Sequence, residues 1–173
     1  MNDSGTYALV IVLGVRLRLR AGKLAVRSFV PGYYVYTGSA LGGLSGRLRH
    51  HLKQEKKLYW HIDYLLREAA VSQIWYALGK ARLECIWNVI VKNLPGAISF
   101  ISGFGASDCQ CSSHLTYFPT IPPFNLFEQR LRQSKMPEVY RLDPNELSEY
   151  DPAKIPALSH DGILLVNSKF KQS

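Results

Sequence analysis

The sequence predicts an α+β fold, an α/β sandwich in which helices flank a small central mixed or antiparallel β-sheet. Three short segments are rich in β-branched and aromatic residues, as strands are: 5–13, 33–37 and 71–78. Three others space their apolar residues three or four apart, as one face of a helix does: 44–52, 60–66 and 82–94. A hydrophobic content of 47% is sufficient for a packed core between these elements.

The first segment, 5–13, predicts a buried strand bounded by Gly5 and Gly14. An added hairpin should follow, because residues 16–20 alternate strictly between arginine and leucine before a tight turn and a returning strand at 24–27. Its three arginines would share the solvent side. They would form either an ordinary solvated face or a nucleic-acid contact.

The segment from Tyr33 to Leu52 has the strongest functional pattern. We expect a strand over 33–37, a sharp turn at Gly38, a loop at Gly42-Gly43, and a helix from residue 43 or 44. Arg47 and His51 lie four apart on that helix and therefore share one side. A strand, a glycine loop and a helix carrying arginine and histidine together would suit an anion-binding site.

The next elements follow a polar connector at 52–57. The helix over 60–66 contains His61, for which a hydrogen-bonded structural role is the simplest interpretation. After the strand at 71–78, the helix over 82–94 should end at Pro95-Gly96. We expect its apolar face to consist of Leu83, Ile86, Trp87 and Ile90. Glu84 lies in its first turn, where the helix dipole favours a negative charge.

Composition divides the chain into a domain over 1–118 and an irregular extension over 119–173, because seven of the nine prolines lie between Pro119 and Pro156. The extension should pack on the domain or be partly disordered. A short helix is expected at 124–132 and a last strand at 162–166.

Charge points to a polyanionic partner. The net charge is +8, and residues 1–118 carry all of the excess, with 14 Lys/Arg against 6 Asp/Glu. Nucleic acid is the usual partner of such a domain, and solubility is the simpler alternative. No apolar run reaches the roughly 18 residues that cross a bilayer, so no membrane partner is expected. Three cysteines are too few for a disulfide framework, which favours a reducing cytoplasm.

The segment Cys109-x-Cys111-x2-His114 places soft ligands close together and could hold zinc. A structural zinc site needs a fourth ligand, which Cys85 or His61 would have to supply. The alternative is a packed loop with reduced thiols.

Several of these residues resemble the GIY-YIG nuclease superfamily. Gly5-Thr6-Tyr7 matches the first half of its signature, and Tyr36-Thr37-Gly38 matches the second. Arg47 and His51 match the basic residues of the first helix, and Glu84 matches the metal-binding glutamate. Thr6 and Thr37 replace the isoleucines of the motif, at positions that we expect to serve packing. The resemblance covers about residues 5 to 117.

The chain is most similar to a little-characterised branch of that superfamily, found alone or appended to archaeal endonuclease III-like repair proteins. The shared segments are Gly38-Ser39-Ala40, Arg49-His50, 60–65, Glu84-Cys85, Phe104-Gly105, 107–109 and 113–115. The resemblance implies a metal-dependent endonuclease that acts on nucleic acid, more specifically DNA, with a role in repair.

The same resemblance implies a role for each site residue. Tyr7 or Tyr36 would accept a proton from the attacking water, and Arg47 would pair with the phosphate. Arg47, His51 and the metal would supply the positive charge that a phenol needs to act as a base near neutral pH. Glu84 would hold one Mg²⁺ or Mn²⁺. Residues implied to bind substrate are Gly38, Ser39, Arg49, His50 and His61. Two alternatives stay open: a nucleic-acid-binding module without cleavage, and a zinc-stabilised interaction domain.

Overall fold

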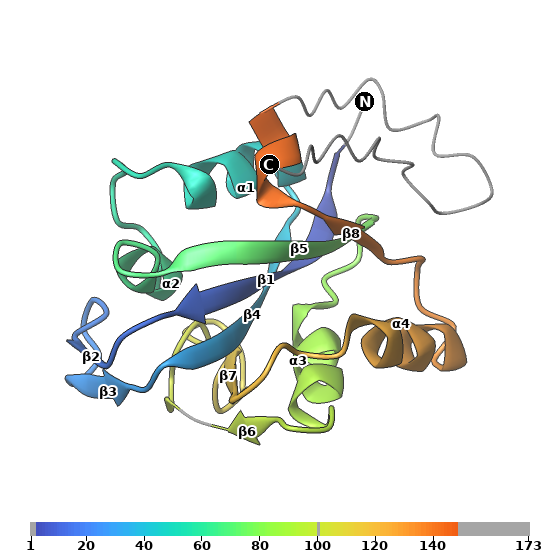
Figure 1. Cartoon of the computed structure of the whole chain (residues 1–173). Helices are drawn as coiled ribbons and strands as arrows, with labels where there is room; N and C mark the ends of the chain where they lie inside the picture. The colour runs from blue at the N-terminus through green and yellow to red at the C-terminus, as the bar shows by residue number, and fades with distance from the viewer. Residues whose placement is uncertain (1–2, 100, 149–173) are drawn as a thin grey trace, which may run out of the picture.

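A six-stranded antiparallel sheet forms the centre of the molecule, in the order β6-β7-β4-β1-β5-β8 (Figure 1). The computed structural model describes residues 3–99 and 101–148. Three long strands lie in the middle: β1 (Gly5–Leu13), β4 (Gly32–Ala40) and β5 (Ala70–Leu78). Shorter strands lie outside them: β6 (Ile98–Ser99), β7 (Leu115–Phe118) and β8 (Tyr140–Leu142). The predicted α+β class is confirmed.

Alternate residues of β1 point to opposite faces of the sheet, and helices cover both faces. Tyr7 and Leu9 belong to one core cluster, with residues of α1 (Leu44–Leu52) and α2 (His61–Leu65). Ala8 and Val10 belong to the other, with residues of α3 (Glu84–Lys92) and α4 (Phe124–Gln133). The two faces therefore have separate hydrophobic cores.

The predicted hairpin is present as β2 (Leu17–Leu19) and β3 (Arg27–Phe29), with Leu17 opposite Phe29. The predicted position of the returning strand, 24–27, is wrong by three residues at its start. Phe29 is almost fully buried and packs against Phe104, so its burial determines where the strand pairs. Arg18 and its two neighbouring arginines are exposed, as expected.

The predicted sharp turn at Gly38 is also wrong, because β4 continues through this residue to Ala40. Gly38 lies opposite Tyr7 of β1. A Cβ atom added at Gly38 would lie 2.7 Å from Cζ and from Oη of Tyr7. Glycine is needed here to make room for the Tyr7 ring, not to turn the chain.

The predicted apolar face of α3 is partly wrong. Trp87 and Val91 are buried against the sheet, whereas Ile86 is 42% exposed. Ile86 is adjacent in sequence to Trp87 and therefore points about 100° away from it around the helix. Burial of the large indole ring sets the orientation of the helix, and Ile86 is left on its outer side.

Residues 119–148 pack on the sheet. In α4, the Phe127 ring stacks on Trp75 of β5 with centroids 4.9 Å apart. Strand β8 pairs with β5 through Ile74 and Leu142, and a 3-10 helix, η1 (Pro144–Ser148), follows it. The predicted helix at 124–132 is confirmed as α4. The strand expected at 162–166 lies outside the described residues. Within 3–99 and 101–148, no helix has the length and apolar character needed to cross a membrane.

Candidate active site

A polar pocket of about 320 Å³ lies where β4 extends beyond its partner β7. Pairing of β4 with β7 ends at Tyr36 and Leu115, whereas β4 continues to Ala40. The walls of the pocket come from β1, β4, α1, α2, the start of α3 and the loop before β7, and include Tyr7, Tyr36, Arg47, His61, Glu84 and His114.

Most of the predicted site residues meet at this pocket. Of the five residues expected to be catalytic, all line it except His51, which is buried directly behind Tyr7. Gly38, Ser39 and His61 line it as well. His50 lines a neighbouring depression, and Arg49 is exposed and lines neither. The structure therefore brings together residues that are separated by up to 77 positions in the chain.

Tyr7, which lines the pocket, makes a buried polar contact with His51 behind it. The Tyr7 hydroxyl oxygen lies 2.8 Å from Nε2 of His51, and the ring is 1% exposed. Burial raises the pKa of Tyr7 to about 12, although the nearby Arg47 guanidinium acts in the opposite direction. Burial and the neighbouring Tyr7 hold the pKa of Tyr36 well above its usual value. Neither phenol is ionised on its own near neutral pH.

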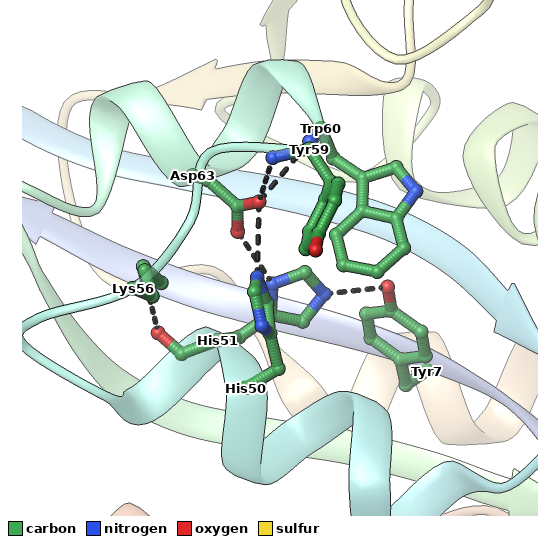
Figure 2. A network of polar contacts seen from close by, with 7 residues as sticks. All are labelled: Tyr7, His50, His51, Lys56, Tyr59, Trp60 and Asp63. Atoms are coloured by element: carbon green, nitrogen blue, oxygen red, sulfur yellow. Dashed lines mark hydrogen bonds and ion pairs between the residues drawn. The ribbon is translucent and has the colours of Figure 1, made fainter.

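Asp63 is the site residue that the sequence did not reveal. Figure 2 shows its carboxylate between the two histidines of α1 and the backbone at the start of α2. One oxygen lies 3.2 Å from Nδ1 of His51, and the other lies 3.1 Å from Nε2 of His50. That second oxygen also accepts the backbone N–H groups of Tyr59 and Trp60.

These contacts determine the charge of Asp63. Burial of the carboxyl works against ionisation, but hydrogen bonds from His51, Trp60, His50 and Tyr59 outweigh it and keep its pKa well below the usual range. His51 is affected differently, because burial lowers its pKa more than Asp63 raises it. Near neutral pH the pair is therefore a carboxylate and a neutral imidazole.

Glu84 is held at the pocket by a chain of hydroxyl groups. The Ser39 hydroxyl donates to a Glu84 carboxylate oxygen and lies 3.1 Å from the Thr6 hydroxyl. Thr6 Oγ1 also accepts the backbone N–H of Leu83 at 3.2 Å, at the start of α3. Thr6 is buried in the sheet, as a packing position should be, and its hydroxyl also helps to position the glutamate.

Positive charge lies over one wall of the pocket and at its rim. The Arg47 guanidinium is 4.0 Å from the centroid of the Trp60 ring, so its flat face is held by the indole. At the rim, Arg82 and Asp108 form an exposed ion pair at 3.8 Å. His61 accepts the backbone N–H of Gly105 on Nδ1 at 3.1 Å, which is a structural role.

A cluster of three cysteines and one histidine shares a wall with the pocket. Cys85, Cys109, Cys111 and His114 place one ligand atom each within 4.8 Å of one another, so the group could hold a metal ion. Nε2 of His114 lies 3.3 Å from Sγ of Cys109 and 3.7 Å from Sγ of Cys85. Ligand atoms around a tetrahedral zinc ion are about 3.5–3.8 Å apart, given its usual bond lengths. Of the two residues expected as a possible fourth ligand, Cys85 belongs to this group and His61 does not.

The His114 ring is oriented as a metal ligand requires. Its Nδ1 atom lies 3.2 Å from the carbonyl oxygen of Thr37, so Nδ1 carries the proton and donates it. The lone pair of Nε2 then points toward the thiols. Metal-binding histidines usually make such a hydrogen bond with their other nitrogen.

One substitution tests how tightly the Tyr7 position is packed. Gly38→Ala is expected to lower the free energy of unfolding by about 1–3 kcal/mol, the usual cost of overpacking. The added methyl would collide with a ring that is buried and hydrogen-bonded to His51. Urea unfolding measures the change. Gly46→Ala is the matched control, because an added Cβ there meets nothing within 4 Å and α1 would gain helix propensity. Equal stabilities of the two variants would contradict the prediction.

The fold and this pocket define an α+β protein with a tyrosine–histidine pair, an arginine and a glutamate around one cavity. The chain belongs to the family described as domain of unknown function DUF123, whose model matches residues 6–136. The matched region includes every pocket residue and all four thiol and imidazole ligands. No curated protein and no solved structure matches the chain.

Proposed function

We propose that this protein is a metal-dependent nuclease that hydrolyses phosphodiester bonds in DNA, with chemistry like that of the GIY-YIG superfamily. The observation that carries the proposal is the convergence of Tyr7, Tyr36, Arg47 and Glu84 on one pocket, with His51 behind Tyr7. Such hydrolysis needs a proton acceptor for water, a cation near the phosphate and help for the leaving oxygen. Residues of suitable chemistry are present for each of these requirements.

Arg47 is the residue that would bind the phosphate. A guanidinium can donate two parallel hydrogen bonds to phosphate oxygens, and stacking on Trp60 limits its movement. Arg82 at the rim would attract the backbone on either side of the scissile bond. The exposed arginines of β2 and its flanks lie on the same positively charged domain.

Tyr7 is the better candidate of the two tyrosines for accepting the proton of water. Its hydroxyl already contacts a histidine nitrogen, and the pKa of His51 is below its usual value, so the imidazole is neutral. As the water attacks phosphorus, Tyr7 would take the water proton and pass its own proton to His51. Tyr36 is also buried, but its hydroxyl makes no hydrogen bond to a histidine among the described residues, so it would line the pocket.

Glu84 is the residue that would hold Mg²⁺ or Mn²⁺. Its carboxylate reaches the pocket and is held by Ser39, and one carboxylate with waters and a substrate phosphate is a normal Mg²⁺ environment. The ion would neutralise charge on the leaving oxygen. Ser39 and Thr6 would keep the carboxylate directed at the pocket.

We also propose that zinc binds to the cluster of Cys85, Cys109, Cys111 and His114. Three thiols and one imidazole are soft ligands that suit Zn²⁺ and do not suit Mg²⁺, which prefers oxygen. With four protein ligands the site would be closed and structural. It would fasten the start of α3, where Glu84 precedes Cys85, to the loop that carries Asp108 and His114. A zinc-stabilised domain that binds DNA without cutting it is the second candidate function, and this metal-ligand group is what favours it.

The function is tested by replacing Tyr7 with phenylalanine. Tyr7→Phe keeps the ring and removes only the hydroxyl, so we expect the cleavage rate to fall about 100-fold or more, as when a general base is lost. The assay uses labelled DNA oligonucleotides (duplex, single-stranded and three-way junction) with Mg²⁺ or Mn²⁺. Bis(p-nitrophenyl) phosphate serves as a probe that requires no DNA recognition.

Tyr117→Phe is the matched control. Tyr117 is also a strand tyrosine, but its hydroxyl donates to the carbonyl of Pro31 at 3.0 Å and it does not line the pocket. The cleavage rate of the Tyr117→Phe variant should equal that of the unmodified protein. If the unmodified protein cleaves none of the probes but binds DNA in a salt-sensitive way, the binding module is correct and the nuclease is not.

A further inference from the structure

We propose that Asp63 is a positioning residue that fixes the tautomer of His51, so that Nε2 can accept the proton of Tyr7. The inference deepens the proposed function and rests on it for its catalytic meaning. The contacts among Asp63, His51 and Tyr7 do not depend on that function. Asp63 lies on α2, His51 on α1 and Tyr7 on β1, and the three side chains form one line of contacts (Figure 2).

The role of Asp63 depends on which nitrogen of the His51 imidazole carries the proton. A neutral imidazole carries one N–H, which can be on Nδ1 or on Nε2. The Asp63 carboxylate can only accept, and its oxygen lies 3.2 Å from Nδ1. The N–H is therefore on Nδ1, and Nε2 is left as the acceptor for the Tyr7 hydroxyl at 2.8 Å. With the other tautomer, two acceptors, Nδ1 and the Asp63 carboxylate, would face each other, and Nε2 could not take the proton of Tyr7.

Asp63 is rigid enough for this role. It is 0% exposed, and its second oxygen accepts the backbone N–H groups of Tyr59 and Trp60 at 3.0 and 3.1 Å. These two bonds, with the contact to His50, fix the plane of the carboxylate. A fixed carboxylate in turn fixes the ring of His51, which is also buried.

The proton balance is complete without another reagent. The water proton moves to the Tyr7 oxygen while the Tyr7 proton moves to Nε2 of His51. The resulting imidazolium is paired with the Asp63 carboxylate, which stabilises it. The bond from phosphorus to the leaving oxygen breaks as the bond to the water oxygen forms, and the leaving oxygen takes a proton from solvent water. Once the product leaves, the proton on His51 returns through Tyr7 to solvent.

Asp63→Asn is the decisive variant, because asparagine has nearly the same shape. Its carbonyl oxygen would take the position that accepts the two backbone N–H groups, which directs its NH₂ group at Nδ1 of His51. That nitrogen would then have to accept, and the imidazole proton would move to Nε2. The same substitution in a Ser–His–Asp hydrolase produces the wrong tautomer and lowers kcat by ~10⁴.

The first readout is the tautomer, which does not depend on any activity. In ¹⁵N-labelled protein, two-bond ¹H–¹⁵N spectra show which nitrogen carries the proton. Among the five histidines, the His51 signals are those that His51→Gln removes. We expect Nδ1–H in the unmodified protein and Nε2–H in Asp63→Asn. The Nε2–H tautomer in the unmodified protein, or the same tautomer in both proteins, would overturn the proposal.

The second readout is the pH dependence of cleavage. His51 is faced by Arg47 and His50 on its own helix, by Lys56 of the connector, by Asp63 of α2, and by Tyr7 and Tyr36 of the sheet. Only Asp63 among these is negative, and it raises the pKa of His51. Its loss should lower that pKa further, so the acidic limb of the rate profile should move to lower pH.

In the same profile we expect the plateau to fall about 100-fold or more, as for loss of an effective general base. If Asp63 only held α1 and α2 together, the rate would fall equally at every pH and the limb would not move. Such a result would also overturn the proposal.

Asp143→Asn is the matched control, because Asp143 also accepts a backbone N–H, that of Asn145 at 2.8 Å, but lies outside the pocket. It should leave the tautomer and the rate profile unchanged.

The two proposals, the nuclease and the positioning role of Asp63, can fail separately. A tautomer change in a protein that cuts no probe supports the positioning role and contradicts the nuclease. A fall in cleavage without a tautomer change supports the nuclease and contradicts the positioning role.

Discussion

Glu84→Gln is expected to abolish metal-dependent DNA cleavage while DNA binding survives. A divalent ion that neutralises the leaving oxygen contributes several kcal/mol to the transition state, which corresponds to about 1,000-fold or more in rate. Glutamine keeps the length of the side chain and an oxygen for the Ser39 hydroxyl, so the start of α3 should stay in place. What it loses is the negative charge that binds the cation. Cleavage of labelled oligonucleotides over a range of Mg²⁺ and Mn²⁺ concentrations measures the effect.

Binding is measured separately by fluorescence anisotropy in EDTA, where no cleavage occurs. Removal of one negative charge beside Arg47 should leave the affinity for DNA equal or slightly higher. Glu128→Gln is the matched control, because Glu128 lies on α4 and pairs with Arg132 of the same helix at 2.8 Å. Full metal-dependent cleavage by Glu84→Gln would show that the glutamate does not bind the ion.

Cys111→Ser is expected to remove one zinc ion per chain and to lower the melting temperature by about 8–16 °C. A structural metal present at about 1,000 times its dissociation constant stabilises the folded state by ~4 kcal/mol. For a protein of this size, each kcal/mol corresponds to about 2–4 °C. The group joins α3 to the loop before β7, and that connection would be lost with the metal.

Metal content is measured by mass spectrometry of the protein purified without added chelator, and stability by thermal unfolding. Gln110→Ser is the matched control, because Gln110 is exposed and lies between the two cysteines of the loop. It should keep both the zinc and the melting temperature. A protein purified without zinc, or a Cys111→Ser variant that retains it, would contradict the prediction.

Local sequence was sufficient to identify the central strands and the four α-helices of the described residues. Strand β1 and helix α1 were predicted within a residue or two of their observed bounds, because residues close together in sequence determine hydrophobic periodicity and glycine or proline boundaries. The same local patterns were misleading at Ile86 and at the returning strand of the hairpin. There the burial of one large ring, Trp87 or Phe29, decided the outcome.

The candidate site was also predictable from the sequence only in part. A motif resemblance predicts the site residues Tyr7, Tyr36, Arg47, His51 and Glu84, and they lie around one pocket or directly behind it. The sequence did not reveal the role of Asp63, whose histidine partners, His51 and His50, are 12 and 13 positions away. Its partners become visible only when α1 and α2 are packed side by side.

By itself, the sequence determined the class of fold, the positive charge of the domain and the residue types able to bind phosphate and metal. Tertiary structure alone decided that Cys85 completes the thiol group, that Gly38 makes room for a ring, and that Asp63 faces His51. The physical reason is distance along the chain. Periodicity specifies which face a residue occupies, but which side chains meet depends on strand register and helix packing.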